Sequence, residues 1–180
     1  MLTNNKKLVN GEIRSCVSYE DFAKVFKVFS YAPFWEAWTP EQVLKTYNSF
    51  QIKDGIIFGY YIDGNCAGIL SLRPFVYGEH PVDFAKDSKT MYLSDIATLP
   101  EFRGMGVATH LLIHGLRHME VLGYENVYLR TNEKGKSESY EIAEKCGFKQ
   151  IWDKCQEVSF PRTRSDIPET DLRIFMARKV

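Results

Sequence analysis

Residues 95–112 read DIATLPEFRGMGVATHLL, and this stretch decides the fold. Its pattern predicts a strand that ends near Thr98, a short turn that carries Gly104 and Gly106, and a helix that begins directly after the turn. The first four N–H groups of a helix have no partner within it, and the helix dipole places partial positive charge at that end. Because glycine has no side chain, the turn leaves room for an anion to approach the backbone. The stretch therefore predicts a cradle for pyrophosphate.

A glycine turn that binds nothing is the competing interpretation, because the spacing of Gly104 and Gly106 is weak evidence by itself. The turn matches neither of two familiar phosphate-binding patterns. No Lys-Ser or Lys-Thr pair follows it, as a Walker loop requires, and Thr109 stands where a dinucleotide-binding turn has its third glycine. Nucleoside triphosphates and dinucleotides are therefore disfavoured as ligands.

Helices and strands are predicted on both sides of this stretch. Strands are expected over residues 12–18, 55–63, 65–75, 90–98 and 126–131, with two more near 148–152 and 172–179. Helices are expected after the N-caps Ser18 and Thr39, and over residues 106–122 and 137–146. The dipeptide Asp63-Gly64 predicts a tight hairpin turn. This alternation predicts an α/β (α+β) protein with a mixed sheet.

Length and composition indicate one globular domain. The chain has 180 residues, of which 44% are hydrophobic, and no repeat or linker divides it, so we expect a single domain over 1–180 with a polar extension at 1–11. Lys and Arg total 23 and Asp and Glu total 23, so no basic excess favours nucleic acid or an anionic membrane. Scattered cysteines, no leader peptide and no long apolar span predict reduced thiols and a cytoplasmic location.

The central stretch resembles the GNAT acyltransferase superfamily. Arg103, Gly106 and Ala108 match its motif R/Q-x-x-G-x-G/A, which follows a strand and opens a helix. The residues around that motif also match the family's sequence pattern: they are Asp95, Ile96, Pro100, Phe102 and Gly104, with Thr98 in place of valine. Gly147-Phe148 resembles a second family segment, Y-x-x-x-G-F. The resemblance covers roughly residues 12–180. It implies a mixed, mostly antiparallel central sheet of about six to seven strands flanked by about four helices.

The resemblance also implies a co-substrate, acetyl-CoA or a related acyl-CoA, and no metal. The backbone of Ile96, Ala97 and Thr98 would bond the pantetheine arm like an added strand. The other implied cofactor-binding residues are Arg103, Gly104, Met105, Gly106, Val107, Ala108, Thr109 and Asn132. The implied function is an N-acetyltransferase that acts on a primary amine of a small molecule or a peptide. A non-catalytic acyl-CoA-binding module is the alternative, and a homodimer is possible because homodimers are frequent in the superfamily.

Acyl transfer to an amine needs an acid for the departing thiolate, and the sequence offers an imperfect candidate. The family commonly places a tyrosine four residues before the glycine of its G-F pair, but here that residue is Ala143. Tyr140, three residues earlier and broadly on the same helix face, is the candidate acid. The alternatives are that Tyr140 only packs against its neighbours and that the thiolate leaves without a dedicated acid.

The candidate base lies on the strand before the cradle. Some relatives have Glu directly before the strand aspartate, but Ser94 fills that position, and Asp95 is the nearest carboxylate. Strand alternation places Ser94 and Asp95 on opposite faces unless a bulge intervenes. For Asp95, structural hydrogen bonding is the favoured interpretation over base chemistry. Weaker candidates lie in the preceding polar segment: Glu79, His80 and Asp83.

Two further clusters of side chains are candidates for binding. Phe34, Trp35 and Trp38 lie with Tyr31 and Glu36 where the resemblance places a wall of the acceptor pocket; the alternative is an aromatic lid packed on the core. His110, His114 and His118 recur at four-residue spacing on one helix and could in principle hold Zn²⁺ or Ni²⁺. No cysteine or carboxylate completes such a site, so we expect these imidazoles to face solvent without a metal.

Overall fold

The computed structural model describes residues 10–31, 38–52, 54–76, 89–132, 134–135, 138–152, 156–159 and 170–180. Within these ranges seven strands lie side by side in the order β1 (Glu12–Arg14), β2 (Ile56–Ile62), β3 (Asn65–Pro74), β4 (Thr90–Thr98), β5 (Asn126–Thr131), β8 (Thr170–Lys179) and β6 (Lys149–Gln150). A further strand, β7 (Gln156–Ser159), pairs with β8. Strands β4 and β5 are parallel, and the other pairs are antiparallel. The mixed, mostly antiparallel sheet is therefore confirmed.

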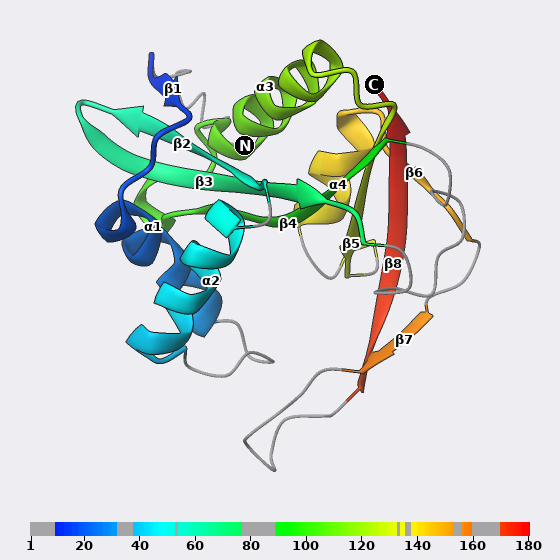
Figure 1. Ribbon diagram of the computed structural model, residues 1–180, viewed down its shortest axis with the longest axis horizontal. Coiled ribbons are helices and arrows are strands. Elements are labelled where there is room, and N and C mark those ends of the chain that lie inside the picture. The colour runs from blue at the N-terminus through cyan, green and yellow to red at the C-terminus, as the bar shows by residue number, and fades with distance from the viewer. Residues whose placement is uncertain are drawn as a thin grey trace, which may run out of the picture.

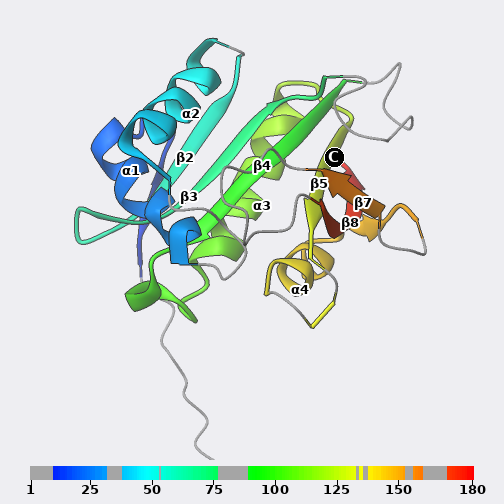
Figure 2. The same cartoon turned by 90° about the horizontal axis from the view of Figure 1, so that it is seen from below.

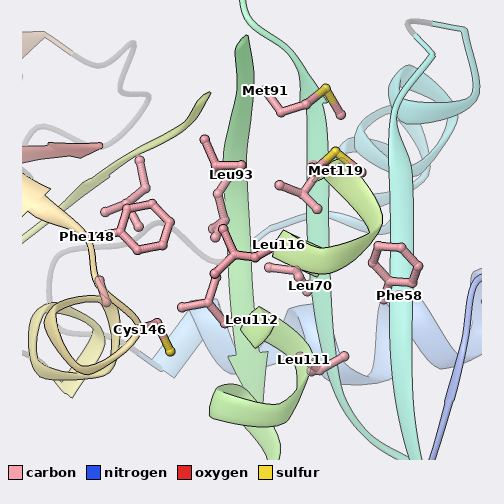
Figure 3. Close-up of a cluster of buried hydrophobic side chains, with 14 of the residues drawn as sticks. Phe58, Leu70, Met91, Leu93, Leu111, Leu112, Leu116, Met119, Cys146 and Phe148 are labelled. Atoms are coloured by element: carbon pink, nitrogen blue, oxygen red, sulfur yellow. The ribbon is translucent and has the colours of Figure 1, made fainter. Parts of the chain in front are cut away.

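Helices cover both faces of the sheet, as Figure 1 shows. Helices α1 (Tyr19–Phe26) and α2 (Pro40–Ile52) lie on one face, where Phe22, Phe26 and Phe50 pack with Ile57 and Ile69 of the sheet. Helices α3 (Val107–Val121) and α4 (Glu138–Lys145) belong to the other face. Figure 3 shows side chains of α3 meeting those of the strands beneath it. The four helices expected from the resemblance are present.

Side-chain caps explain why the first two helices begin where they do. Ser18 Oγ accepts a hydrogen bond from the Asp21 amide at 3.1 Å. Thr39 Oγ1 accepts from the Gln42 amide at 3.2 Å, and the Thr39 amide donates to Gln42 Oε1 at 2.8 Å, which together form a capping box. Both predicted N-caps are confirmed.

Helix α3 approaches the sheet closely because two glycines face it. A Cβ on Gly115 of α3 would lie 2.6 Å from Leu70 Cδ2, and a Cβ on Gly68 of β3 would lie 2.7 Å from Val107 Cγ1. A larger side chain at either position would push the helix outward. These contacts hold the first residue of α3 directly against β3 and β4.

Two expectations need correction. The first strand ends at Arg14 rather than near Ser18, because the chain must leave the sheet edge before Ser18 can cap α1. The three histidines of α3 do not simply face solvent. His114 and His118 stack on each other and meet the ring of Phe58 edge-on at 4.9 and 5.2 Å, and His110 lies against Tyr60 of the same strand. The helix thus buries a wider face than its aliphatic residues alone indicate.

Candidate functional site

The site begins where strands β4 and β5 part. Their pairing runs only from Thr90 with Asn126 to Leu93 with Leu129, whereas β4 stays paired with β3 as far as Thr98. Figure 2 shows the two parallel strands together at one end and diverging toward the other. Beyond Leu93, one edge of β4 therefore has no strand partner among the described residues. Its backbone groups are available to a ligand that can bond like a strand.

A β-bulge lies at the point of divergence. Leu72 pairs with Leu93 and Ser71 pairs with Asp95, so Ser94 is an extra residue in β4. Leu93 and Ile96 consequently pack in the same core cluster, on the α3 face. Strict alternation would put Asp95 on that face as well, but the bulge turns it to the face of α1 and α2. The bulge foreseen as a possible exception is present.

Asp95 is held by a serine on the neighbouring strand. Ser71 Oγ donates a hydrogen bond to Asp95 Oδ2 at 2.7 Å. Burial raises the pKa of Asp95 above its usual range, while the Ser71 hydrogen bond and the positive charges of Arg130 and Arg73 act in the opposite direction. The carboxyl group is therefore able to take up a proton more readily than an exposed aspartate.

A cavity of about 560 Å³ opens beside Asp95 and extends across the gap between β4 and β5. Ser94, Asp95 and Ile96 line it from β4, and Ser139, Ile142 and Ala143 line it from α4. Trp38 closes it on the α1 and α2 side, where its ring meets Phe26 edge-on at 5.1 Å. Of the residues predicted for the site, the structure brings Ser94, Asp95, Ile96, Asn132 and Trp38 together here.

The predicted anion cradle has the backbone geometry that it requires. Gly104 and Gly106 have φ values of 75° and 81°, a region that favours glycine, and Gly106 caps α3. The first amide bonded at the helix start is that of His110, which donates to Gly106 O at 3.0 Å. The amides of Val107, Ala108 and Thr109 precede it, so the helix itself does not use them. The turn is shaped to receive an anion.

Two buried hydroxyl groups on β4 lack a hydrogen-bond partner. They are Ser94 Oγ and Thr98 Oγ1, and neither has a donor or acceptor within the part of the chain that the structure describes. An unpaired buried hydroxyl is costly, so such groups usually mark a place where a ligand or water completes the site. Both hydroxyls belong to the residues that bound the open edge of β4. The edge therefore fits a long ligand with amide groups, such as the pantetheine arm.

Tyr140 lies apart from this cavity. It is 8% exposed, belongs to the core cluster beneath α3, and its ring lies 5.6 Å from Lys134 Nζ. Ala143 on the same helix does line the cavity. The position where the family commonly carries tyrosine thus faces the site but has no hydroxyl. A catalytic role for Tyr140 stays a prediction, and its placement does not support it.

Several predicted residues lie outside the described part of the chain. These are Phe34, Trp35 and Glu36 of the aromatic cluster, together with Glu79, His80 and Asp83; of Tyr31 only the backbone is described. In the described ranges, no group of three His, Cys, Asp or Glu residues is placed to hold a metal ion. No helix in those ranges is both long and apolar enough to cross a membrane.

Sequence reasoning missed the positive charges of the cavity. Arg73, Arg130 and Arg173 all line it, from β3, β5 and β8. Each follows a leucine within a strand, so a charged residue interrupts an apolar run in all three places. That signal was present in the sequence. Only the strand order could show that the three positions meet.

Comparisons with known proteins bear on the family and the fold. The sequence model of the acetyltransferase (GNAT) family matches residues 20–148. An N-acetyltransferase from Staphylococcus aureus Mu50 has a similar structure, with a TM-score of 0.71 and 18% identity over 94% of this chain and 98% of that one. For a ribosomal-protein-alanine N-acetyltransferase from Brucella melitensis, the TM-score is 0.70 and the identity 14%, over 94% and 99% of the two chains.

A protein from Salmonella typhimurium described as an acetyltransferase, and solved with its cofactor acetyl-CoA, is also similar. Its TM-score is 0.69 and its identity 15%, over 94% of each chain. No curated protein sequence matches this chain significantly.

Proposed function

Because this chain belongs to the acetyltransferase (GNAT) family, we propose that it transfers the acetyl group of acetyl-CoA to a primary amine bound in the cavity beside Asp95. The observation that carries the proposal is the open edge of β4 from Ser94 to Thr98. This edge joins the two parts that the reaction needs. The anion cradle at the start of α3 follows it in the chain, and Asp95 and the cavity lie at its other end.

The cofactor-binding residues follow from this arrangement. The backbone of Ile96, Ala97 and Thr98 would pair with the amide groups of the pantetheine arm. The amides of the first turn of α3, with Arg103 and the two glycines before it, would hold the pyrophosphate. Asn132 at the end of β5 lies across the gap and would contact the same arm. No residue in this set needs a metal ion.

The reaction forms a C–N bond and breaks a C–S bond. The acceptor nitrogen must lose a proton, and Asp95 would take it, directly or through a water molecule. Ser94 Oγ lines the cavity and has no hydrogen-bond partner among the described residues, and it would donate a hydrogen bond to the acetyl oxygen as charge develops there. The sulfur leaves as a thiolate, which is tolerable without a dedicated acid because a thiol has a pKa of about 8.5.

The cradle is tested by calorimetric titration with acetyl-CoA and with free CoA. The wild-type protein should bind both, and Gly106→Trp should abolish binding because the indole would occupy the path of the pyrophosphate. Gly123→Trp is the matched control: Gly123 also has a positive φ, lies at the other end of α3, and has open space around it. If the wild-type protein binds neither compound, the proposed function is wrong.

Turnover is tested separately, by thiol release across a broad set of amines. Asp95→Asn should lower the rate with acetyl-CoA binding kept. Tyr140→Phe tests the original acid prediction: a lower rate would support it, and an unchanged rate would assign Tyr140 to packing alone.

A non-catalytic acyl-CoA-binding module remains the second candidate. The observation that favours it is that Ala143 and Ser94 stand where the family commonly carries a tyrosine and, in some members, a glutamate. Tight acetyl-CoA binding without turnover of any amine would support this candidate. Thiol release that depends on an added amine would contradict it.

A further inference from the structure

The carbonyl group of Gly106 accepts two hydrogen bonds from a single residue. The backbone amide of His110 donates to Gly106 O at 3.0 Å, which is the first bond of helix α3. The imidazole of the same residue lies with Nδ1 2.9 Å from that oxygen. A carbonyl oxygen has two lone pairs and can only accept, so Nδ1 carries the proton and donates the second bond. Gly106 is therefore bonded to its helix twice, whereas the carbonyl of an ordinary N-cap residue accepts only the first bond of the helix.

The second bond matters because of what lies on the other side of the same peptide unit. The C=O of Gly106 and the N–H of Val107 share one planar trans peptide, so the two groups point in opposite directions. Since the oxygen is directed along the helix toward His110, the Val107 amide points out of the helix start, toward the turn. That amide is one of the first four, which have no partner within the helix. The direction of Gly106 O therefore fixes the direction of one N–H group of the proposed cradle.

A glycine makes this peptide unit easy to turn. Gly106 has a φ of 81°, and glycine adopts many backbone conformations at similar free energy. Helix ends also fray. One backbone bond at the end of a helix is thus a weak restraint on the plane between Gly106 and Val107. A side-chain donor on the same oxygen adds a second restraint to that plane.

The imidazole is itself held against the sheet. Its ring lies beside that of Tyr60 of β2, with the centroids 5.7 Å apart and the planes at 41°. Tyr60 is 5% exposed and belongs to the core cluster beneath α3. The chain passes close to its ring at Gly11, where a Cβ would lie 2.2 Å from Tyr60 Cε1. The His110 ring therefore rests on a fixed neighbour, and groups that are fixed before binding lose little entropy when a ligand arrives.

Resting on the proposed function, we infer that His110 is a positioning residue of the cofactor site: its Nδ1–H holds the peptide between Gly106 and Val107 so that the Val107 amide faces the pyrophosphate of acetyl-CoA. In this role the imidazole acts through Gly106 and not on the reacting atoms, and it needs no metal ion. The role also separates His110 from the other two histidines of α3, His114 and His118, which pack against Phe58.

Three variants separate the hydrogen bond from the ring. His110→Phe keeps a ring beside Tyr60 and removes the donor. His110→Asn removes the ring and keeps a donor, since Nδ2 of asparagine is as many bonds from Cα as Nδ1 of histidine. Histidine, phenylalanine and asparagine have similar helix propensities, so these replacements should affect the helix itself equally. His118→Phe is the matched control, because it makes the same replacement near the other end of α3, where the ring meets Phe58.

Calorimetric titration well below the Tm gives the Kd of acetyl-CoA for each folded variant, and circular dichroism gives the Tm. His110→Phe should raise the Kd about three- to tenfold, the usual effect of one hydrogen bond. His110→Asn and His118→Phe should stay within about twofold of the wild-type Kd. A role in helix stability alone would lower the Tm of His110→Phe and leave its Kd unchanged.

The pattern of Kd values decides the inference. An unchanged Kd in His110→Phe, an equal rise in His118→Phe, or a rise that His110→Asn does not prevent would overturn it and leave the proposed cofactor site intact. If His110→Phe does not fold, His110→Leu takes its place with the same expected rise. A wild-type protein that does not bind acetyl-CoA would instead refute the proposed function itself.

Discussion

Gly68→Ala should weaken both the fold and the binding of acetyl-CoA, because it separates α3 from the sheet at the start of the cradle. The new Cβ would lie 2.7 Å from the Ala97 carbonyl oxygen and 2.7 Å from Val107 Cγ1. Neither atom can move freely. The carbonyl belongs to β4, which pairs with β3 at this point, and Val107 is the first residue of α3.

The expected size of the effect follows from these contacts. Overpacking of this kind costs about 1–3 kcal/mol, and replacing a strand glycine by alanine returns about 0.5–1 kcal/mol. The net loss is about 0–2.5 kcal/mol, and its middle value of about 1 kcal/mol corresponds to a fall in Tm of about 2–4 °C for a protein of this length. Acetyl-CoA affinity should fall as well, because Val107 would contribute one of the amides of the proposed cradle.

Gly115→Ala is the matched control. Its Cβ would meet Leu70 Cδ2 at 2.6 Å, but that atom ends a flexible side chain, and alanine in a helix gains about 1 kcal/mol over glycine. Circular dichroism melts and calorimetric titration measure both effects. A Gly68→Ala protein with wild-type Tm and wild-type affinity, or a Gly115→Ala protein that loses as much affinity, would refute the reasoning.

Three other predictions concern charge and capping. Ser71→Ala should move the acidic limb of the pH–rate profile to higher pH, because the Ser71 hydrogen bond lowers the pKa of Asp95; an unmoved limb would mean that Asp95 does not set it. His114→Phe should flatten the loss of stability on acidification, measured by urea denaturation at a series of pH values. Burial, together with the charges of His118 and Arg117, lowers the pKa of His114 below its usual 6.5 in the folded protein. The free energy of unfolding that the neutral imidazole contributes is therefore fully present above pH 6.5 and is lost as the pH falls through the pKa of the folded state. A variant with the wild-type slope of unfolding free energy against pH would contradict this. Thr39→Ala should cost about 1 kcal/mol of unfolding free energy and Thr39→Ser much less, because serine keeps the cap; equal losses would exclude capping as the cause.

Much of the fold could be predicted because local signals were strong. Strand β4 spans residues 90–98 and β5 spans 126–131, as the patterns indicated. The hairpin turn at Asp63 and Gly64 has the positive φ values that its sequence requires. Turn residues, caps and apolar period act within a few positions of one another, so one sequence is enough to reveal them.

The site was less predictable because it depends on contacts between distant segments. The bulge at Ser94 adds one residue to a strand with apolar residues on both faces, so alternation alone could not show which face Asp95 occupies. The arginines of the cavity are separated by more than forty residues each and meet only through the strand order. His114 and His118 of α3 pack on Phe58 because α3 lies close to the sheet, and helical period carries no information about that distance.

The short pairing between β4 and β5 also sets how the molecule would respond to a mechanical load. These strands share four paired positions, whereas β2 and β3 share seven, β3 and β4 seven, and β5 and β8 six. Parallel pairs are also slightly weaker per residue than antiparallel ones. A force that pulls β1 to β4 away from β5 to β8 would therefore part the sheet along this seam first. A ligand that hydrogen-bonds to β4 and contacts β5 would add interactions between these two strands. The rupture force of the protein should therefore rise when acetyl-CoA is bound.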